Sequence, residues 1–186
     1  MRLSRRTRRF LVLLHVLSAV SWIGVDLVIG ALSFAGLTTD NPRRMAIAYT
    51  ALGMFAVPLL LTLGLLTLTT GVILGLGTRY GLLRYWWVAV KLVLNLVLTA
   101  LVLVALRPAL VEGAAEATLV DPSLPQRLAR VRFDMIFPPL VSTTTLLFAA
   151  WLGSYKPWGP TRRGKRALEA EREERARERV RVPSPR

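Results

Sequence analysis

Cysteine is absent from this chain of 186 residues, and histidine occurs once, as His15. Without cysteine the chain can form neither disulfides nor thiolate metal sites. A metal centre held by two histidines of one chain is excluded as well. Any chemistry beyond packing must therefore depend on His15, on hydroxyl and amide groups, and on a small number of charged side chains.

Acidic residues are scarce: there are 11, against 25 lysines and arginines, and the net charge is +14. Such an excess can indicate nucleic-acid binding. Here the basic residues lie at the two ends of the chain and in short loops beside apolar runs, without a recognisable nucleic-acid-binding motif or interleaved aromatic residues. We therefore expect no nucleic-acid partner. The distribution is typical of cytoplasmic flanks of membrane spans, in contact with anionic lipid headgroups.

Long apolar runs dominate the rest of the sequence, which is 53% hydrophobic with a mean hydropathy of +0.47. A helix needs about 20 apolar residues to cross a bilayer. Four runs are long enough, at residues 10–37, 45–76, 85–106 and 137–155. The sequence predicts an all-α, polytopic membrane protein. Its parts are a basic head (residues 1–9), a bundle of four transmembrane helices (residues 10–158) and a charged tail (residues 159–186).

The first apolar run has an alternative interpretation as a signal peptide. A basic head precedes it, and Ala19-Val20-Ser21 resembles a cleavage site. However, the run continues to Leu37, whereas the apolar part of a signal peptide is about 7–15 residues long. We therefore predict an uncleaved membrane helix.

Local signals mark the ends of several helices. Asp40 or Asn41 can cap the second span, with Pro42 in its first turn. Residues 107–136 form the longest connection. Within it, Ser123 and Gln126 predict a capping box that begins a short amphipathic helix at residues 125–135, lying on the membrane surface. For the charged tail, a solvated helix and disorder both remain open.

The distribution of lysine and arginine predicts the orientation. Four spans place both termini on one side of the membrane. That side carries five basic residues in the head, two in the 77–84 loop and eleven from Lys156 onward, against six in the opposite loops. By the positive-inside rule we expect both termini of this multi-pass protein in the cytoplasm.

One helical face of the first span carries polar side chains. His15, Ser18, Trp22 and Asp26 follow each other at intervals of three, four and four residues. A polar stripe on a membrane helix is costly unless it faces protein or water. We therefore expect the other helices to be arranged around this stripe. Trp22 is more often a packing residue than a site residue in such a position.

His15 and Lys91 are predicted to lie at the same depth. His15 is five residues past Phe10 and Lys91 is six past Tyr85, so both lie about 8–9 Å inside the cytoplasmic boundary. If the faces converge, they line a pocket together with Gly71, Asn95 and Trp151. Two plainer interpretations remain open. His15 can serve as an interhelical hydrogen-bonding residue, and Lys91 can extend towards lipid phosphates.

Asp26 is placed apart from this pocket. It lies about 24 Å along the first span from Phe10, which we interpret as near the outer surface. There it would extend outward or pair with an arginine, for which the candidates are Arg43, Arg107 and Arg132.

Three segments resemble the CopD/HemJ-type integral membrane proteins and their uncharacterised bacterial relatives. They are LHVLSAVSWIGVD in the first span, VPLL…TTG in the second, and GTRYGLLRYWWVAVK from Gly77 to Lys91. The resemblance covers roughly residues 10–110. It implies a haem-linked membrane oxidoreductase of the HemJ type, in which His15 is the ligand of the haem b iron and Lys91 the essential third-helix lysine. Asn95 and Trp22 are then the further cofactor-binding candidates.

The sequence is also compatible with functions other than haem-linked redox chemistry. A non-enzymatic membrane subunit or small transporter would use the polar residues for helix packing, and a homo-oligomer is compatible with either function. Copper uptake, which the CopD likeness implies, is the weakest candidate, because one histidine and four scattered methionines give no cluster of soft ligands.

Overall fold

The computed structural model describes residues 3–78 and 81–181, and within them the chain is helical without a β-strand. Met1 and Arg2 of the basic head, Arg79 and Tyr80 of the 77–84 loop, and tail residues 182–186 lie outside the described residues. Four helical segments are long and apolar enough to cross a membrane, at Arg5–Thr38, Pro42–Gly77, Trp86–Glu116 and Ala129–Tyr155. The prediction of an all-α membrane protein with four spans is confirmed.

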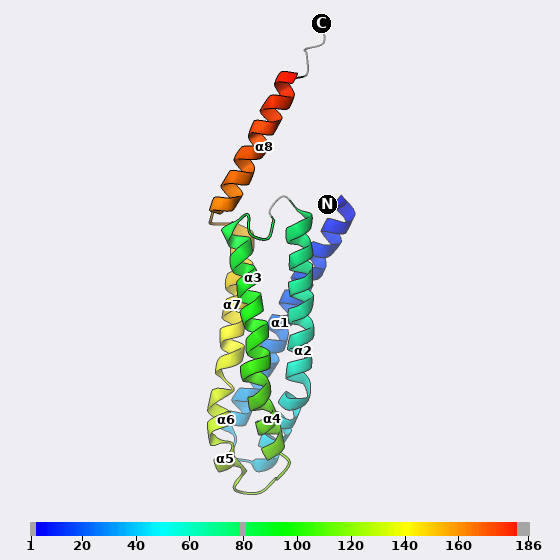
Figure 1. The fold of residues 1–186 in the computed structure, drawn as a ribbon. Coiled ribbons are helices and arrows are strands. Elements are labelled where there is room, and N and C mark those ends of the chain that lie inside the picture. Colours follow the sequence, from blue (N-terminus) through cyan, green and yellow to red (C-terminus); the bar gives the residue numbers. More distant parts are fainter. Residues whose placement is uncertain (1–2, 79–80, 182–186) are drawn as a thin grey trace.

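The long helices lie side by side in an elongated bundle (Figure 1). They are α1 (Arg5–Thr38), α2 (Pro42–Gly77), α3 (Trp86–Leu101) and α7 (Phe137–Tyr155). The beginning of α1, the end of α7 and the beginning of α8 (Arg162–Arg181) share one end, which we call the terminal end. The helices α4 (Arg107–Glu116), α5 (Leu124–Arg127) and α6 (Ala129–Asp134) form the opposite end, which we call the connector end.

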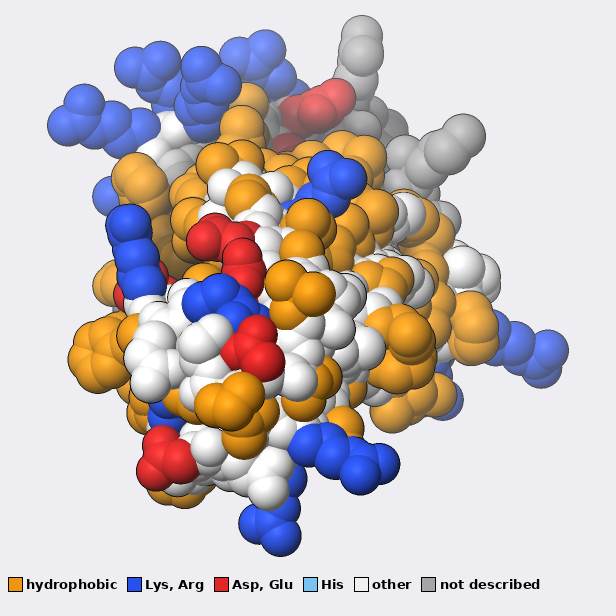
Figure 2. Space-filling model, turned by 90° about the horizontal axis from the view of Figure 1, so that it is seen from below, with side chains coloured by type: hydrophobic (Ala, Val, Ile, Leu, Met, Phe, Trp, Pro, Cys, Tyr) orange, Lys and Arg blue, Asp and Glu red, His pale blue; other side chains and the backbone are white. Residues whose placement is uncertain are grey.

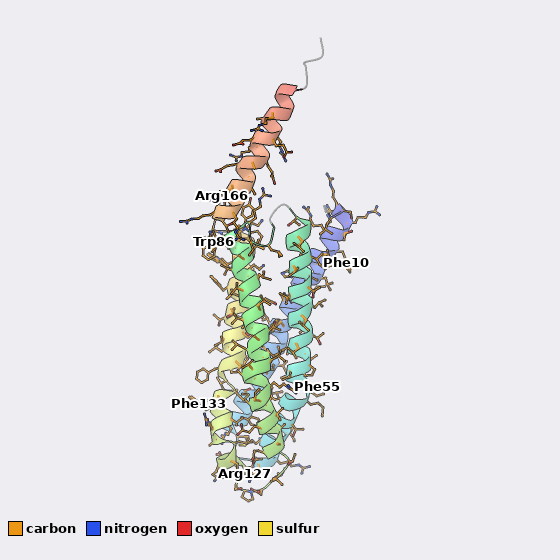
Figure 3. The ribbon with its side chains drawn as sticks, in the orientation of Figure 1. Phe10, Phe55, Trp86, Arg127, Phe133 and Arg166 are labelled. Atoms are coloured by element: carbon orange, nitrogen blue, oxygen red, sulfur yellow. The ribbon has the colours of Figure 1, made fainter. Side chains whose placement is uncertain are left out.

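The lipid-exposed surface is apolar. Phe10, Phe55 and Phe133 are exposed and point away from the bundle (Figure 3). The buried apolar core instead joins α1, α2 and the third span, with Trp22, Tyr49 and Leu52 among its members. In lipid this core is stabilised by close packing rather than by the release of water, because lipid tails are as apolar as leucine.

Asn41 caps α2, as one of the two predicted candidates. Its side-chain oxygen accepts hydrogen bonds from the backbone N–H groups of Arg43 and Arg44 at 3.0 and 3.2 Å, and Pro42 occupies the first turn. Asparagine accepts these bonds because the first N–H groups of a helix have no partner within the helix.

The third span is longer than predicted. The predicted span ended at Leu106, but the helix passes through a π-helical turn, Val102–Leu106, and continues as α4 to Glu116. Proline lacks the N–H that an α-helical bond requires. The wider turn accommodates this loss: the Arg107 N–H bonds to the carbonyl of Val102, five residues back.

The predicted capping box at Ser123 and Gln126 is wrong. The Ser123 hydroxyl donates to the Asp121 carboxylate at 2.6 Å and makes no cap bond to the helix. A nearby carboxylate is a stronger acceptor than a helix terminus, and it draws the hydroxyl away. The predicted helix at 125–135 is also broken at Leu128, into α5 and α6.

Arg127 holds the connector end together. Its guanidinium bonds to the Asp121 carboxylate at 3.0 Å, to Glu116 at 2.8 Å and to the carbonyl of Leu119 at 2.7 Å. The hydrogen bonds from Ser123, and then from Arg127, hold the pKa of Asp121 below its usual range, because they favour the charged carboxylate. Figure 2, a view from this end, shows acidic and basic side chains gathered on it.

The tail begins as a helix docked on the loop that joins α2 to α3. The Thr161 hydroxyl donates to the carbonyl of Leu83 at 2.8 Å, and the N–H of Thr161 donates to the carbonyl of Arg84 at 2.9 Å. Arg84 then pairs with Glu171 of α8 at 3.0 Å. Of the two alternatives for the tail, the structure has the helix.

Candidate functional site

The polar stripe of α1 faces the interior of the bundle. Ser18, Trp22 and Asp26 are 3%, 0% and 2% exposed, and His15 is partly buried. The stripe continues beyond Asp26 through Ser33, which is fully buried. The prediction that these side chains share a protein-facing side is confirmed, since a period of 3.6 residues keeps them on one face.

The His15 ring is fixed by hydrogen bonds to α2. Its Nδ1 atom lies 3.0 Å from the Thr67 carbonyl oxygen and 3.0 Å from the Thr70 hydroxyl. A carbonyl oxygen can only accept, so Nδ1 carries the hydrogen. The Thr70 hydroxyl donates in turn to the carbonyl of Leu66 at 2.7 Å, which leaves its oxygen free to accept from His15. In the neutral ring, Nε2 is then the atom with a lone pair to offer a ligand.

Ser18 extends this network by one turn of α1. The Thr67 hydroxyl donates to the Ser18 hydroxyl at 2.9 Å, and Ser18 donates to the carbonyl of His15 at 3.0 Å. The bond between Thr67 and Ser18 joins α2 to α1, and the bond from Ser18 to the His15 carbonyl lies within α1.

Small residues of α2 allow this close approach. A Cβ added to Gly71 would lie 3.2 Å from Cε1 of His15. Gly64, two turns away, contacts the Trp22 ring and the Thr99 hydroxyl. The predicted pairing of Gly71 with His15 is therefore present.

Lys91 of α3 lies near His15 of α1. It is partly buried and close enough to the imidazole for an electrostatic interaction. Its amino group contacts Gly153 of α7, where an added Cβ would lie 2.9 Å from Nζ. Gly153 is two residues from the end of α7, so the amino group reaches towards the terminal end between two helices.

Asn95 lies one turn beyond Lys91 on α3 and is 9% exposed. Neither polar atom of its amide has a hydrogen-bond partner among the described residues. The same is true of the Thr99 hydroxyl and the indole N–H of Trp22. Buried polar atoms are nearly always hydrogen-bonded, so this part of the interior is suited to water or a polar ligand. Trp22 packs against Gly64, in agreement with its expected packing role.

Trp151 does not line the pocket, contrary to our prediction. It is 45% exposed, and its ring stacks on Phe148 at 5.9 Å and contacts Tyr155 at 5.6 Å on the outer face of α7. Its depth was consistent with the pocket, but depth does not determine which face of a helix turns inward. Gly153, two residues further along α7, takes the place beside Lys91.

Asp26 does not extend outward as expected, nor does it pair with an arginine among the described residues. Asp26 is 2% exposed, and its carboxyl group lies beside the Ser142 hydroxyl of α7. Because α7 packs along α1, the carboxyl group faces protein and does not extend outward. Arg132, one of its expected partners, instead donates to the carbonyls of Leu37 and Thr39 at the connector end.

Sequence reasoning missed the partners on the facing helices. Thr67 and Thr70 hold the histidine, Thr99 lies against Gly64, and Ser142 meets Asp26. The one available signal was polarity within an apolar span. Polarity alone does not show which residue faces another helix, because Thr144 and Thr145 bond to carbonyls of their own helix at 2.8 and 2.7 Å.

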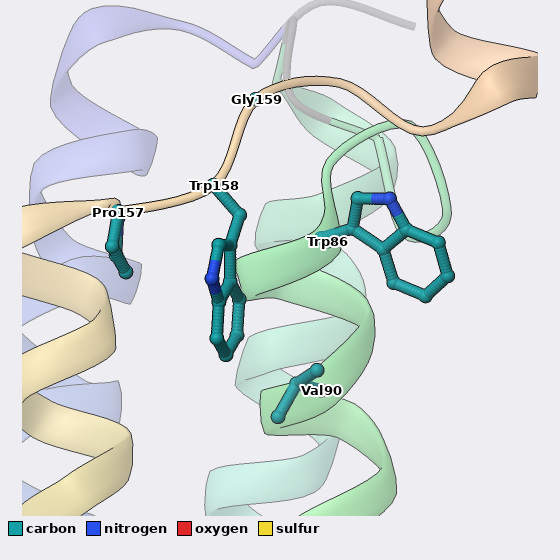
Figure 4. Close-up of a pocket in the computed structure, with 5 residues that line it drawn as sticks. All are labelled: Trp86, Val90, Pro157, Trp158 and Gly159. Atoms are coloured by element: carbon teal, nitrogen blue, oxygen red, sulfur yellow. The ribbon is translucent and has the colours of Figure 1, made fainter.

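A separate apolar groove of about 540 Å³ lies at the terminal end (Figure 4). It is lined by Trp86, Val90, Pro157, Trp158 and Gly159, which join the beginning of α3 to the segment after α7. His15 and Lys91 are not among the lining residues. Within the described ranges, no group of three His, Asp or Glu side chains is placed to hold a metal ion.

No family model, curated protein or solved structure matches the chain.

Proposed function

We propose that this integral membrane protein binds haem b through His15 and has a redox role in a bacterial cytoplasmic membrane. The observation that carries the proposal is the fixed His15 ring. A hydrogen bond from Nδ1 to a backbone carbonyl is the usual way in which proteins orient a metal-binding histidine and present Nε2.

The donor set fits a haem held by one histidine. His15 supplies a single nitrogen ligand, and the Lys91 ammonium nearby can pair with a propionate carboxylate. Asn95 offers two unpartnered polar atoms on the same face of α3 as Lys91. When bound, haem supplies one-electron chemistry, while these side chains bind and orient it. The resemblance to HemJ-type proteins supports the same assignment of His15 and Lys91.

The first prediction concerns the optical spectrum of the purified protein. Expressed with ample haem, the wild-type chain should show a Soret band, and His15→Ala should lose it because the axial ligand is removed. Gly24→Ala is the matched control on the same helix, since a Cβ at Gly24 meets nothing within 4 Å. A wild-type spectrum without the band, or an unchanged band in His15→Ala, would contradict the proposal.

A second candidate is a non-enzymatic membrane subunit or small transporter. The observation that favours it is the tight packing of the same ring, with Gly71 against Cε1 and two hydrogen bonds to α2. In that case His15→Ala would leave function intact, while Gly71→Leu would disrupt assembly. Copper uptake gains no support from the described residues, because they bring no second soft ligand to His15.

Orientation and lipid contacts complete the proposal. We place both termini in the cytoplasm, because the basic residues are concentrated at the terminal end. Lys156 and the arginines at the beginning of α8 would then face the anionic headgroups of the inner leaflet. A homo-oligomer is compatible with the exposed apolar faces of the helices.

A further inference from the structure

Buried and partly buried polar side chains follow one another through most of the length of the bundle. On α1 they are His15, Ser18, Trp22, Asp26 and Ser33, and the facing helices add Thr67, Asn95, Thr99 and Ser142. We call this set the polar row. With a helical rise of 1.5 Å per residue, Asp26 lies about 24 Å from Phe10 and about 12 Å from Phe34, two exposed residues of the apolar surface of α1.

Asp26 is the acid within this row, and it is almost completely enclosed. Its neighbour on α7 is Ser142, and its Oδ2 atom has no hydrogen-bond partner among the described residues. A carboxyl group inside a membrane protein is costly, and such groups mark ion or proton pathways more often than structural contacts.

The other ionisable side chains facing the row lie near its two ends. His15 of α1 and Lys91 of α3 are on the terminal side, and Tyr49 of α2 and Arg132 of α6 are on the connector side. His15 is eleven residues from Asp26, and Gly36, which contacts Tyr49, is ten residues from it. Each end is therefore about 15 Å from Asp26 along the bundle.

Hydrogen-bonding groups occur at successive turns between Asp26 and the terminal end. The Trp22 N–H, the Thr99 hydroxyl and the Asn95 amide are buried and have no hydrogen-bond partner in the described part of the chain. The Ser18 and Thr67 hydroxyls follow, 2.9 Å apart, and then His15 and Thr70, 3.0 Å apart. Ordered water commonly satisfies buried polar groups that have no protein partner, so water molecules at these positions would link the groups into a hydrogen-bonded path.

On the connector side of Asp26 the polar row continues with fewer polar groups. The Ser33 hydroxyl is fully buried and has no hydrogen-bond partner within residues 3–78 and 81–181, and the Tyr49 hydroxyl is buried near Gly36. Beyond them, the Arg132 guanidinium bonds to the carbonyls of Leu37 and Thr39, where α1 ends. Polar groups thus lie on both sides of Asp26.

We propose that the polar row conducts protons across the membrane, with Asp26 as the internal carrier. The carboxylate of Asp26 accepts a proton from a hydronium ion on one side, and its O–H bond forms as the O–H bond of the hydronium breaks. The neutral carboxylic acid then gives the proton to a water molecule on the other side, which restores the carboxylate. A metal cation is a poorer match, because hard cations require six or more oxygen ligands and Asp26 is the single carboxylate here. The proposal does not depend on haem.

The test uses the full chain in vesicles of phosphatidylcholine and phosphatidylglycerol that contain a pH-sensitive dye. A potassium gradient with valinomycin provides the driving voltage. We expect wild-type vesicles to acidify faster than empty vesicles, and Asp26→Asn to fall to the rate of empty vesicles. Asp134→Asn is the control, because Asp134 is an exposed acid of α6 outside the row and should keep the wild-type rate.

Two results would overturn the proposal: a wild-type rate equal to that of empty vesicles, or an Asp26→Asn rate equal to wild type. If Asp26→Asn does not fold, Ser142→Ala and Thr99→Val remove hydroxyl groups of the row and leave the acid in place. Unchanged proton flux in both of these variants would then contradict the proposal. The proton flux and the Soret band are independent measurements. A negative result for proton flux does not contradict haem binding, and a missing Soret band does not contradict proton conduction.

Discussion

Gly64→Leu is expected to prevent the bundle from closing. A Cβ at this position would lie 2.8 and 2.9 Å from atoms of the Trp22 ring and 3.0 Å from the Thr99 hydroxyl. Three helices therefore meet at Gly64, and a leucine side chain must push α1 and α3 away from α2. Overpacking of this kind typically costs about 1–3 kcal/mol, and the cost rises when backbone must move.

The measurement is the midpoint of unfolding in a detergent titration, followed by size-exclusion chromatography. Gly24→Leu is the matched control, because nothing lies within 4 Å of a Cβ built there. Gly64→Leu should aggregate or unfold at a markedly lower denaturant concentration, while Gly24→Leu should behave as the wild type. Equal midpoints for the two variants would mean that α2 does not approach α1 as described.

Trp22→Ala is expected to cause the largest loss of stability among the tryptophan substitutions. Trp22 is 0% exposed and fills the space beside Gly64. Removal of a fully buried tryptophan leaves a cavity and typically costs about 3–5 kcal/mol. In a membrane the loss comes from packing contacts, since the exposed alternative is also apolar.

Trp86→Ala provides the comparison, because Trp86 is 54% exposed at the rim of the apolar groove. Substitutions at such surface positions usually change the free energy of unfolding by about 0.5 kcal/mol or less. Both variants can be followed by the loss of helical circular dichroism in a detergent titration. A smaller effect for Trp22→Ala than for Trp86→Ala would contradict the packing of α1.

Which face of α1 turns inward was predictable, because its polar residues recur at helical spacing in the sequence. His15, Ser18, Trp22 and Asp26 recur at helical spacing, and the cost of polar groups in lipid requires that face to turn inward. The same reasoning found the four spans, since length and hydropathy set the requirement for crossing a bilayer.

The partners of that face were not predictable, because they depend on how other helices are rotated. Ser142 is more than a hundred residues from Asp26, and no local pattern indicates that it turns towards α1. The prediction that Trp151 lines the pocket failed for the same reason, although its expected depth matched that of Lys91. The third span ran past its expected end because a π-helical turn accommodates Pro108, a solution that the proline does not itself reveal.

The polar face of α1 packs against α2, and a cysteine crosslink tests this packing most directly. The chain contains no cysteine, so each introduced pair is unique. Ser18→Cys with Thr67→Cys places two sulfur atoms where hydroxyl oxygens lie 2.9 Å apart. We predict rapid disulfide formation on mild oxidation in membranes, and none for Leu17→Cys with Thr67→Cys, because Leu17 is exposed. Crosslinking of the second pair but not the first would contradict the account.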